Sequence, residues 1–157
     1  MKAMKGPFVG VATNKQNAAN IQAPLVGVAS GEFTITLRGV PLGAVNGGGR
    51  ISNVWLSIAT SGKDDTNTLS VAADVKINGT SCLTTQPAIA HVSGEASQQK
   101  TTKVTGDTGI TQAVMNSSAN TYAAGDVITY DRIITRTASP TTELANWVLV
   151  VELEPVI

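Results

Sequence analysis

The chain has 157 residues, of which 42% are hydrophobic, 14% are charged and 4% are aromatic, with equal numbers of basic and acidic side chains. This length fits one domain, and the hydrophobic content is typical of a folded chain. A net charge of zero without a basic cluster argues against a nucleic-acid partner. The charged share lies below the roughly 25% of an average soluble domain, which predicts a weakly charged surface suited to packing against other proteins.

The cysteine count and the apolar runs bear on the cellular compartment in which the chain is made. Cys82 is the only cysteine, so the chain forms no disulfide within itself. The first residues, MKAMKGPFVGV, include lysines but no apolar segment of a secretory signal. The longest apolar run, Trp147–Val151, is far shorter than the roughly 20 residues of a membrane helix. We therefore expect synthesis in the cytosol and no membrane partner.

Residues 1–30 are predicted to form an extended N-terminal arm. Glycine and proline interrupt the segment, which argues against a helix, and its three lysines with no acid give it a charge of +3. Such a segment is able to add as a strand to the sheet edge of another chain. The alternative is that it forms the first strand of its own sandwich. Its lysines and isolated apolar residues are Lys2, Lys5, Lys15, Phe8, Val9 and Val11.

Residues 31–157 are predicted to form a single β-sandwich of about eight antiparallel strands. Apolar and polar residues alternate in several short runs, as they do in strands with one buried and one solvated face. Regularly spaced turns between the runs favour a sandwich or barrel. One helical turn is expected at 141–146, after Pro140. The strands are expected near residues 33–38, 50–60, 67–77, 80–85, 88–92, 110–115, 127–136 and 146–153.

The clearest hairpin signal lies between residues 68 and 83. Apolar residues stand at every second position from Leu69 to Ile77, and Asn78-Gly79 follows directly. This dipeptide supplies the two positive φ angles of a type I′ turn. We expect a two-residue turn that sets the register of its hairpin.

The only histidine, His91, is the obvious candidate for acid–base chemistry. Ser93 lies two residues after it and Cys82 nine residues before it, but neither lies in a recognisable nucleophile motif. We interpret His91 as a surface residue at a strand edge. One cysteine and one histidine do not complete a structural zinc site, although a site shared between subunits around a symmetry axis stays open.

Two groups of residues with side-chain oxygens are candidates for a catalytic pair and for a calcium site. Glu152 and Glu154 share one face of a strand, about 6.8 Å apart, a separation that suits an inverting glycosidase. A solvated pair near the end of the chain is the favoured interpretation. Asp64, Asp65 and Asn67 offer oxygens to calcium but lack the spacing of a calcium loop, so a polar hairpin loop is favoured.

The remaining motifs predict structure rather than chemistry. The glycine-rich stretch 43–50 lacks the Lys-Ser/Thr of a phosphate loop and leads into a strand instead of a helix. The sequons at Asn78 and Asn116 are interpreted as accidental, and Trp55 and Trp147 as packing residues. We therefore predict no catalytic residue, no metal site and no cofactor, and we predict that the protein is not an enzyme.

A series of short motifs runs through residues 50–153. It comprises Asn53–Thr60, the loop Gly62–Asp65, Leu69–Ile77, Asn78–Ser81, Thr84–Pro87, the corner Ala124–Ile128 and the final run Trp147–Leu153. The series resembles small jelly-roll proteins of tailed-bacteriophage virions, in particular capsid decoration (cement) proteins and related head-fibre domains. Residues 1–49 match nothing in that family.

The resemblance implies a homotrimeric, non-enzymatic virion protein on the outer surface of a phage capsid. It would bind the major capsid protein and bridge neighbouring capsomers, after synthesis in the host cytoplasm. Trimer formation would also cover apolar side faces. Two alternatives remain: a receptor-binding or fibre-tip domain of a phage tail, and a carbohydrate-binding module or glycan-active enzyme. The residues expected to contact capsid or sister subunit are Lys2, Lys5, Phe8, Val9 and Val11.

Overall fold

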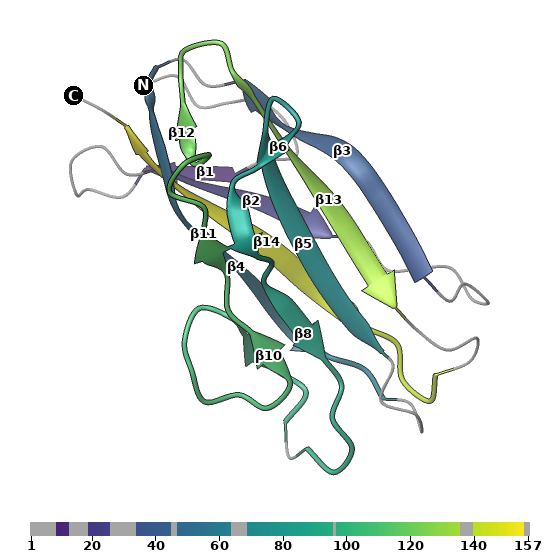
Figure 1. Ribbon diagram of the computed structural model, residues 1–157. Helices are drawn as coiled ribbons and strands as arrows, with labels where there is room; N and C mark the ends of the chain where they lie inside the picture. The colour runs from purple at the N-terminus through teal and green to yellow at the C-terminus, as the bar shows by residue number, and fades with distance from the viewer. Residues whose placement is uncertain are drawn as a thin grey trace.

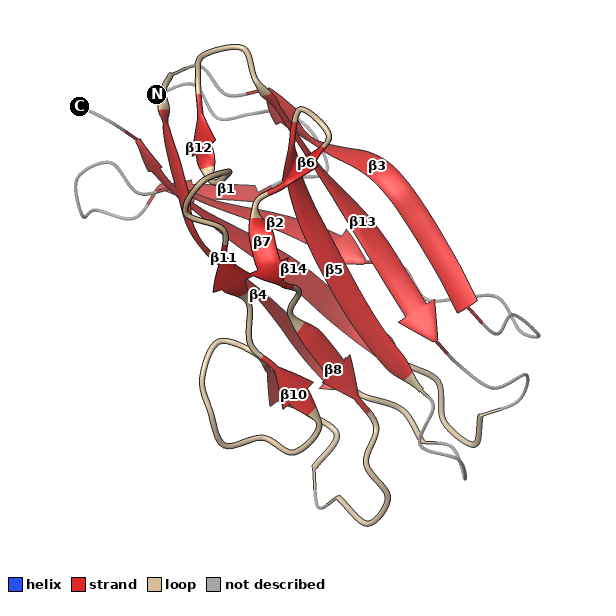
Figure 2. Cartoon of the chain, in the orientation of Figure 1, coloured by secondary structure: helices blue, strands red, loops and turns tan. Residues whose placement is uncertain are grey.

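The computed structural model describes residues 9–12, 19–25, 34–44, 47–63, 69–95, 97–135 and 140–155. Every regular element among them is a β-strand (Figure 2), so the all-β prediction is confirmed. The helical turn predicted at 141–146 is wrong. Thr142 instead forms a β-bridge with Lys63, and a strand begins at Ala145, because this segment pairs with the rest of the sandwich rather than with itself.

Each of the eight predicted runs contains at least one strand, and four further strands lie outside those runs. The strands are β1 (Val9–Ala12), β2 (Ala19–Leu25), β3 (Thr34–Ala44), β4 (Gly49–Thr60), β5 (Ser70–Ile77), β6 (Thr80–Ser81), β7 (Leu83–Thr85), β8 (Ala88–Ala90), β9 (Lys100–Thr101), β10 (Ile110–Thr111), β11 (Val114–Met115), β12 (Thr121–Tyr122), β13 (Val127–Thr135) and β14 (Ala145–Pro155). Those outside the predicted runs are β1, β2, β9 and β12.

Two antiparallel sheets form the body of the molecule, stacked face to face as Figure 1 shows. The first has the order β1-β2-β14-β4-β12, and β9 also pairs with β4. The second has the order β10-β8-β5-β13-β3, and β6 also pairs with β5. A small third sheet joins β11 to β7. This arrangement is a β-sandwich, as predicted.

The chain crosses repeatedly between the two sheets. It passes from β2 in the first sheet to β3 in the second, back to β4, and then to β5. The β5–β6 hairpin and β8 stay in the second sheet, and the chain then goes to the first sheet for β9, back to the second for β10 and again to the first for β12. It ends with β13 in the second sheet and β14 in the first. Strands that are neighbours in sequence therefore face each other more often than they pair.

The core fills the space between the sheets. Leu56 of β4 pairs with Leu149 of β14, and both side chains are fully buried. Val75 of β5 and Ile128 of β13 are equally buried on the second sheet. Because aromatic residues are scarce, aliphatic side chains supply most of this core, and burying each one fully stabilises the fold by about 1.5–3 kcal/mol.

Both tryptophans are buried, as predicted, but in different places. Trp147 belongs to the core between the sheets. Trp55 alternates with the core residue Leu56, so it lies on the opposite face of the first sheet, next to Val150 in the register. The ammonium of Lys103 lies 4.4 Å from the centre of the Trp55 ring, and Trp55 is only 8% exposed. The loop after β9 therefore covers apolar surface that the sandwich would otherwise leave open.

The hairpin at Asn78-Gly79 has the predicted geometry. Ile77 pairs with Thr80, which leaves the two intervening residues as the turn. Their φ angles are 49° at Asn78 and 85° at Gly79, both positive as a type I′ turn requires.

The N-terminal strands extend the first sheet. β1 pairs with β2 over four positions, and β2 pairs with β14. Pairing within the chain's own sheet is what the alternative interpretation of residues 1–30 predicts. Val9 and Val11 lie on β1, whereas Lys2, Lys5 and Phe8 lie outside the described residues. Binding of residues 1–30 to another protein stays a prediction.

Candidate functional site

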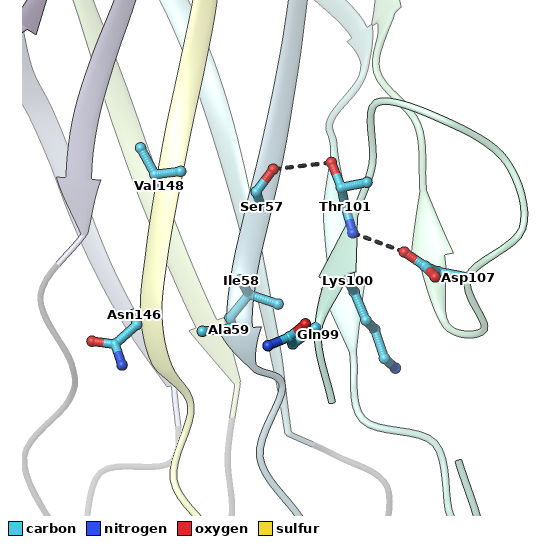
Figure 3. A pocket seen from close by; sticks show the side chains of 9 residues that line it. All are labelled: Ser57, Ile58, Ala59, Gln99, Lys100, Thr101, Asp107, Asn146 and Val148. Atoms are coloured by element: carbon cyan, nitrogen blue, oxygen red, sulfur yellow. Dashed lines mark hydrogen bonds between the residues drawn. The ribbon is translucent and has the colours of Figure 1, made fainter. Parts of the chain in front are cut away.

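A groove of about 390 Å³ lies on the outer face of the first sheet, where β14, β4 and β9 run side by side (Figure 3). Its floor is apolar, from Ala59 and Val148, and its rim carries amides and a carboxylate. The lining residues are Ser57, Ile58, Ala59, Gln99, Lys100, Thr101, Asp107, Asn146 and Val148.

Side-chain hydrogen bonds hold β9 against β4 beside this groove. The hydroxyls of Ser57 and Thr101 are 3.0 Å apart, and the Thr101 amide donates to Oδ2 of Asp107 at 2.9 Å. One residue later, Thr102 places its hydroxyl where it accepts the buried Leu56 amide at 2.9 Å. Two of these contacts, Ser57–Thr101 and Leu56–Thr102, connect β9 and the residue after it to β4, whereas Asp107 holds the Thr101 amide from the loop after β9.

The polar rim can offer hydrogen bonds to a ligand. Asn146 is exposed at the start of β14 and has a φ angle of 56°, which asparagine tolerates better than most residues. Gln99 is exposed at the opposite side of the groove. Amide side chains over a small apolar floor are suited to a neutral polar ligand, and the volume lies within the usual range for small-molecule sites.

A buried polar cluster lies behind the groove, and Lys100 belongs to both. The Glu95 carboxylate accepts the Ser61 hydroxyl at 2.7 Å and contacts His91 Nδ1 at 3.2 Å, both through Oε1. Its other oxygen, Oε2, forms an ion pair with Lys100 and accepts the Val92 amide at 3.2 Å. This cluster joins the end of β4, the loop after β8 and the start of β9.

Burial and charge act in opposite directions on Glu95. Burial raises the pKa of its carboxyl, but hydrogen bonds from Lys100, Ser61 and His91, together with the Lys100 charge, outweigh that effect and lower the pKa below its ordinary value. Glu95 is therefore a carboxylate at neutral pH, paired with an ammonium whose side chain is only 2% exposed.

The surface position predicted for His91 is wrong. The residue is 4% exposed, because its amide donates to the Leu69 carbonyl at 2.8 Å and draws the chain inward after β8. Its ring does not face a nucleophile in the way a catalytic dyad needs. Ser61 donates to Glu95 rather than to the imidazole, and His91 Nε2 is buried with no hydrogen-bond partner among the described residues.

A second ionic cluster lies on the outer face of the second sheet. Asp74 of β5 and Asp131 of β13 are opposite each other in the register and both are buried. Lys76 Nζ lies 2.5 Å from Oδ2 of Asp131 and 3.9 Å from Oδ2 of Asp74. Ser81 donates to Asp74 Oδ1 at 2.5 Å. One lysine thus separates two carboxylates that would otherwise repel each other across the strands.

Cys82 follows this cluster and is completely buried. Burial, with a smaller contribution from the Asp74 charge, raises the pKa of its thiol to about 12. The thiol is therefore protonated at neutral pH and is a poor nucleophile or metal ligand.

Of the acidic candidates from the sequence, the structure describes Glu152 and Glu154, both on β14. Glu154 forms an ion pair with Arg50 across β14 and β4, with Arg50 Nε 2.5 Å from Oε2, and both side chains are about half exposed. Glu152 pairs with Asn53 in the register on the other side of a β-bulge. Asp64, Asp65 and Asn67 lie outside the described residues.

Two kinds of feature are absent from the described part of the chain. It holds no group of three or more histidine, cysteine, aspartate or glutamate side chains placed to bind a metal ion. It also holds no helix long and apolar enough to cross a membrane.

Sequence reasoning missed the Glu95–Lys100 pair entirely. Both residues lie in a polar stretch, and no period marks either as buried. The only signal was the spacing of four between His91 and Glu95, which in a loop carries little weight.

No protein-family model matches the sequence, and a search of curated proteins found none that matches it significantly.

Proposed function

We propose that the chain is a jelly-roll structural protein of a phage virion, which binds the outer surface of the capsid as a homotrimer and bridges capsomers. The observation that supports this proposal best is the strand order. The four-stranded orders β2-β14-β4-β12 and β3-β13-β5-β8, connected by repeated crossings between the sheets, are the orders that we would expect of a jelly roll, and they support the proposal. This architecture is used by viral capsid proteins, and also by lectins and cupins.

The exposed parts of the sandwich are suited to protein contacts. Val114 and Val127 are 51% and 41% exposed at loop ends, and Val104 is 56% exposed on the loop that covers Trp55. The proposed capsid contacts of the N-terminal segment are Lys2, Lys5, Phe8, Val9 and Val11, and its lysines would contribute positive charge to binding. Apolar anchors with surrounding polar groups are typical of a specific interface.

Two measurements test the proposal. Light scattering after size-exclusion chromatography should give the mass of a trimer, and cryo-electron microscopy of virions made with and without the protein should show added density on the capsid. A stable monomer both alone and on its target would exclude the trimer. Unchanged capsids, or density on the tail, would exclude the capsid location.

A truncation tests the role of the N-terminal segment within this proposal. Deleting residues 2–12 removes β1, which pairs only with β2 among the described strands, while β2 keeps β14. The truncated protein should therefore fold with a nearly unchanged melting temperature and lose attachment to capsids. Loss of folding would favour the interpretation as an integral strand, and undiminished attachment would remove the segment from the interface.

The groove supports a second candidate, a receptor-binding or carbohydrate-binding domain on a phage tail. Its exposed amides, Gln99 and Asn146, lie beside an apolar floor, and lectins share the jelly-roll architecture. Binding to a panel of neutral glycans, with Asn146→Ala as the variant, separates this candidate from the first. Glycan binding that is lost in the variant would favour the tail location.

A further inference from the structure

The exposed Asn78-Gly79 turn is held by a neighbouring turn. Asn78 Nδ2 donates to Oδ1 of Asp126 at 2.8 Å, and Asn78 Oδ1 accepts the Val127 amide at 3.0 Å. Both polar atoms of the Asn78 side chain are therefore engaged. The two turns lie close together because Ile77 and Ile128 pair in the register just below them.

Asp126 is itself fixed in this position. Its Oδ2 accepts the Ala123 amide at 2.7 Å, and its own amide donates to the Ala123 carbonyl at 3.2 Å. The hydrogen bonds from Ala123 and Asn78 lower the pKa of Asp126, so it is ionised at neutral pH. The Asn78 amide nitrogen thus donates to a carboxylate that is itself held in place.

Asn-Gly is the dipeptide most prone to deamidation, because glycine presents its backbone nitrogen without a side chain to shield it. That nitrogen attacks Cγ of the asparagine, a new C–N bond forms, and ammonia leaves with the proton that the nitrogen gives up. Water then opens the cyclic imide to aspartate or isoaspartate. Both residues are exposed here, and nothing lies within 4 Å of the position a Gly79 Cβ would occupy, so space does not prevent the reaction.

We propose that Asn78 is a latent deamidation site, and that its contacts with Asp126 and Val127 keep it in the amide form. Attack by the Gly79 nitrogen requires the side chain to rotate and give up both hydrogen bonds. The product would weaken the contact between the two turns. Once a carboxylate replaces the amide, residue 78 loses its donor and faces the ionised Asp126, and like charges at this distance repel.

Conversion would act where the β5–β6 turn meets the turn between β12 and β13. Isoaspartate adds a backbone atom to a two-residue turn, and the new charge separates the β5–β6 turn from the turn before β13. Both effects would loosen this end of the second sheet while leaving the core residues in place.

The test compares the wild type with Asp126→Ala during incubation of the folded protein at physiological temperature and mildly alkaline pH. Peptide mapping by mass spectrometry follows the amide-to-acid conversion at each asparagine. We expect conversion at Asn78 to be severalfold faster in D126A than in wild type, and severalfold faster in wild type unfolded by urea than in folded wild type.

Three controls make the result specific. Asp107→Ala removes a carboxylate that caps the Thr101 amide in a different turn, and it should leave the rate at Asn78 unchanged. Conversion at Asn46, which also precedes glycine, should be the same in D126A and wild type. If D126A does not fold, D126N keeps the shape of the side chain while removing its charge and one acceptor oxygen, and it should also speed conversion at Asn78.

Equal rates at Asn78 in wild type and in a folded Asp126 variant would overturn the proposal. So would equal acceleration in D107A, or a parallel increase at Asn46, because each would indicate general loosening. The variant Asn78→Asp mimics one product and should melt at a lower temperature than wild type; an unchanged melting temperature would remove the structural consequence.

Discussion

Replacing Glu95 by glutamine removes one charge from a buried ion pair while keeping the size of the side chain. The side chains of Glu95 and Lys100 are 6% and 2% exposed. In the variant, the Lys100 ammonium keeps its hydrogen bond to the Ala90 carbonyl at 2.7 Å but loses its counter-ion. Removing one partner of a buried pair costs about 3–5 kcal/mol, since the remaining charge is left without compensation.

Urea denaturation followed by tryptophan fluorescence measures this loss directly. For a chain of this size, a loss of about 3–5 kcal/mol lowers the melting temperature by roughly 6–20 °C. The double variant E95Q/K100M removes both charges and should regain most of the loss, because replacing a whole buried pair by neutral groups is often tolerated. K100M alone should be as unstable as E95Q, because it leaves the carboxylate unpaired.

The pH dependence of stability provides an independent measurement. The pKa of Glu95 is lower in the folded state than in the unfolded chain, where a glutamate has a pKa of about 4.3. Between these two pKa values the folded protein therefore binds fewer protons than the unfolded chain. The contribution of Glu95 to the free energy of unfolding is fully present above the unfolded pKa and is lost as the pH falls through the folded pKa. E95Q should lack this part of the acid dependence. A loss below about 1 kcal/mol in E95Q, or a double variant no more stable than the single ones, would refute the buried-pair argument.

Three further variants test local contacts by thermal and urea denaturation. Gly79→Val forces a β-branched residue to a φ of 85° and should cost about 1 kcal/mol or more, whereas an unchanged melt would mean that this turn does not set the register. Thr102→Val leaves the buried Leu56 amide without its acceptor and should cost about 1–3 kcal/mol, with Thr102→Ser close to wild type; equal stability of both would contradict this role. Gly49→Ala places a Cβ 2.5 Å from the Tyr122 hydroxyl oxygen and should cost about 1–3 kcal/mol through overpacking, so a stable variant would show that this corner yields easily.

The long strands could be predicted because their signal is local. Along β5, Val71, Ala73 and Val75 face the core, and that alternation is visible without any knowledge of the partner strands. The same holds for the Asn78-Gly79 turn, whose two positive φ angles follow from residue type. Short strands such as β9 and β12 gave no such signal, because two paired residues have no period. Their place in the sheet depends on β4, which offers them its free edge.

The polar clusters could not be predicted, because burial of a charge depends on residues distant in the sequence. Lys100 is buried beside Glu95, and the carboxylate of Glu95 accepts a hydrogen bond from Ser61, which lies 34 positions earlier in the sequence. Asp74 and Asp131 are 57 positions apart in numbering and meet only through the pairing of β5 with β13. A charged residue in a polar stretch is usually solvated. For this reason the sequence favoured a surface position for His91, which is wrong, and gave no indication that Glu95 and Lys100 are buried beside it.

The burial of these charges changes what the composition implies about the surface. Asp74, Lys100 and Asp131 are all buried, so the described surface of the sandwich is even less charged than the sequence indicates. Contacts made by such a surface depend on apolar area and hydrogen bonds, and salt screens them little. The lysines of residues 1–30 have no acidic neighbours in sequence, and any contact they make with an acidic partner would weaken as salt rises. Capsid attachment of the full chain that weakens as salt rises would therefore support contacts by the N-terminal lysines, whereas attachment that salt leaves unchanged would assign binding to the sandwich.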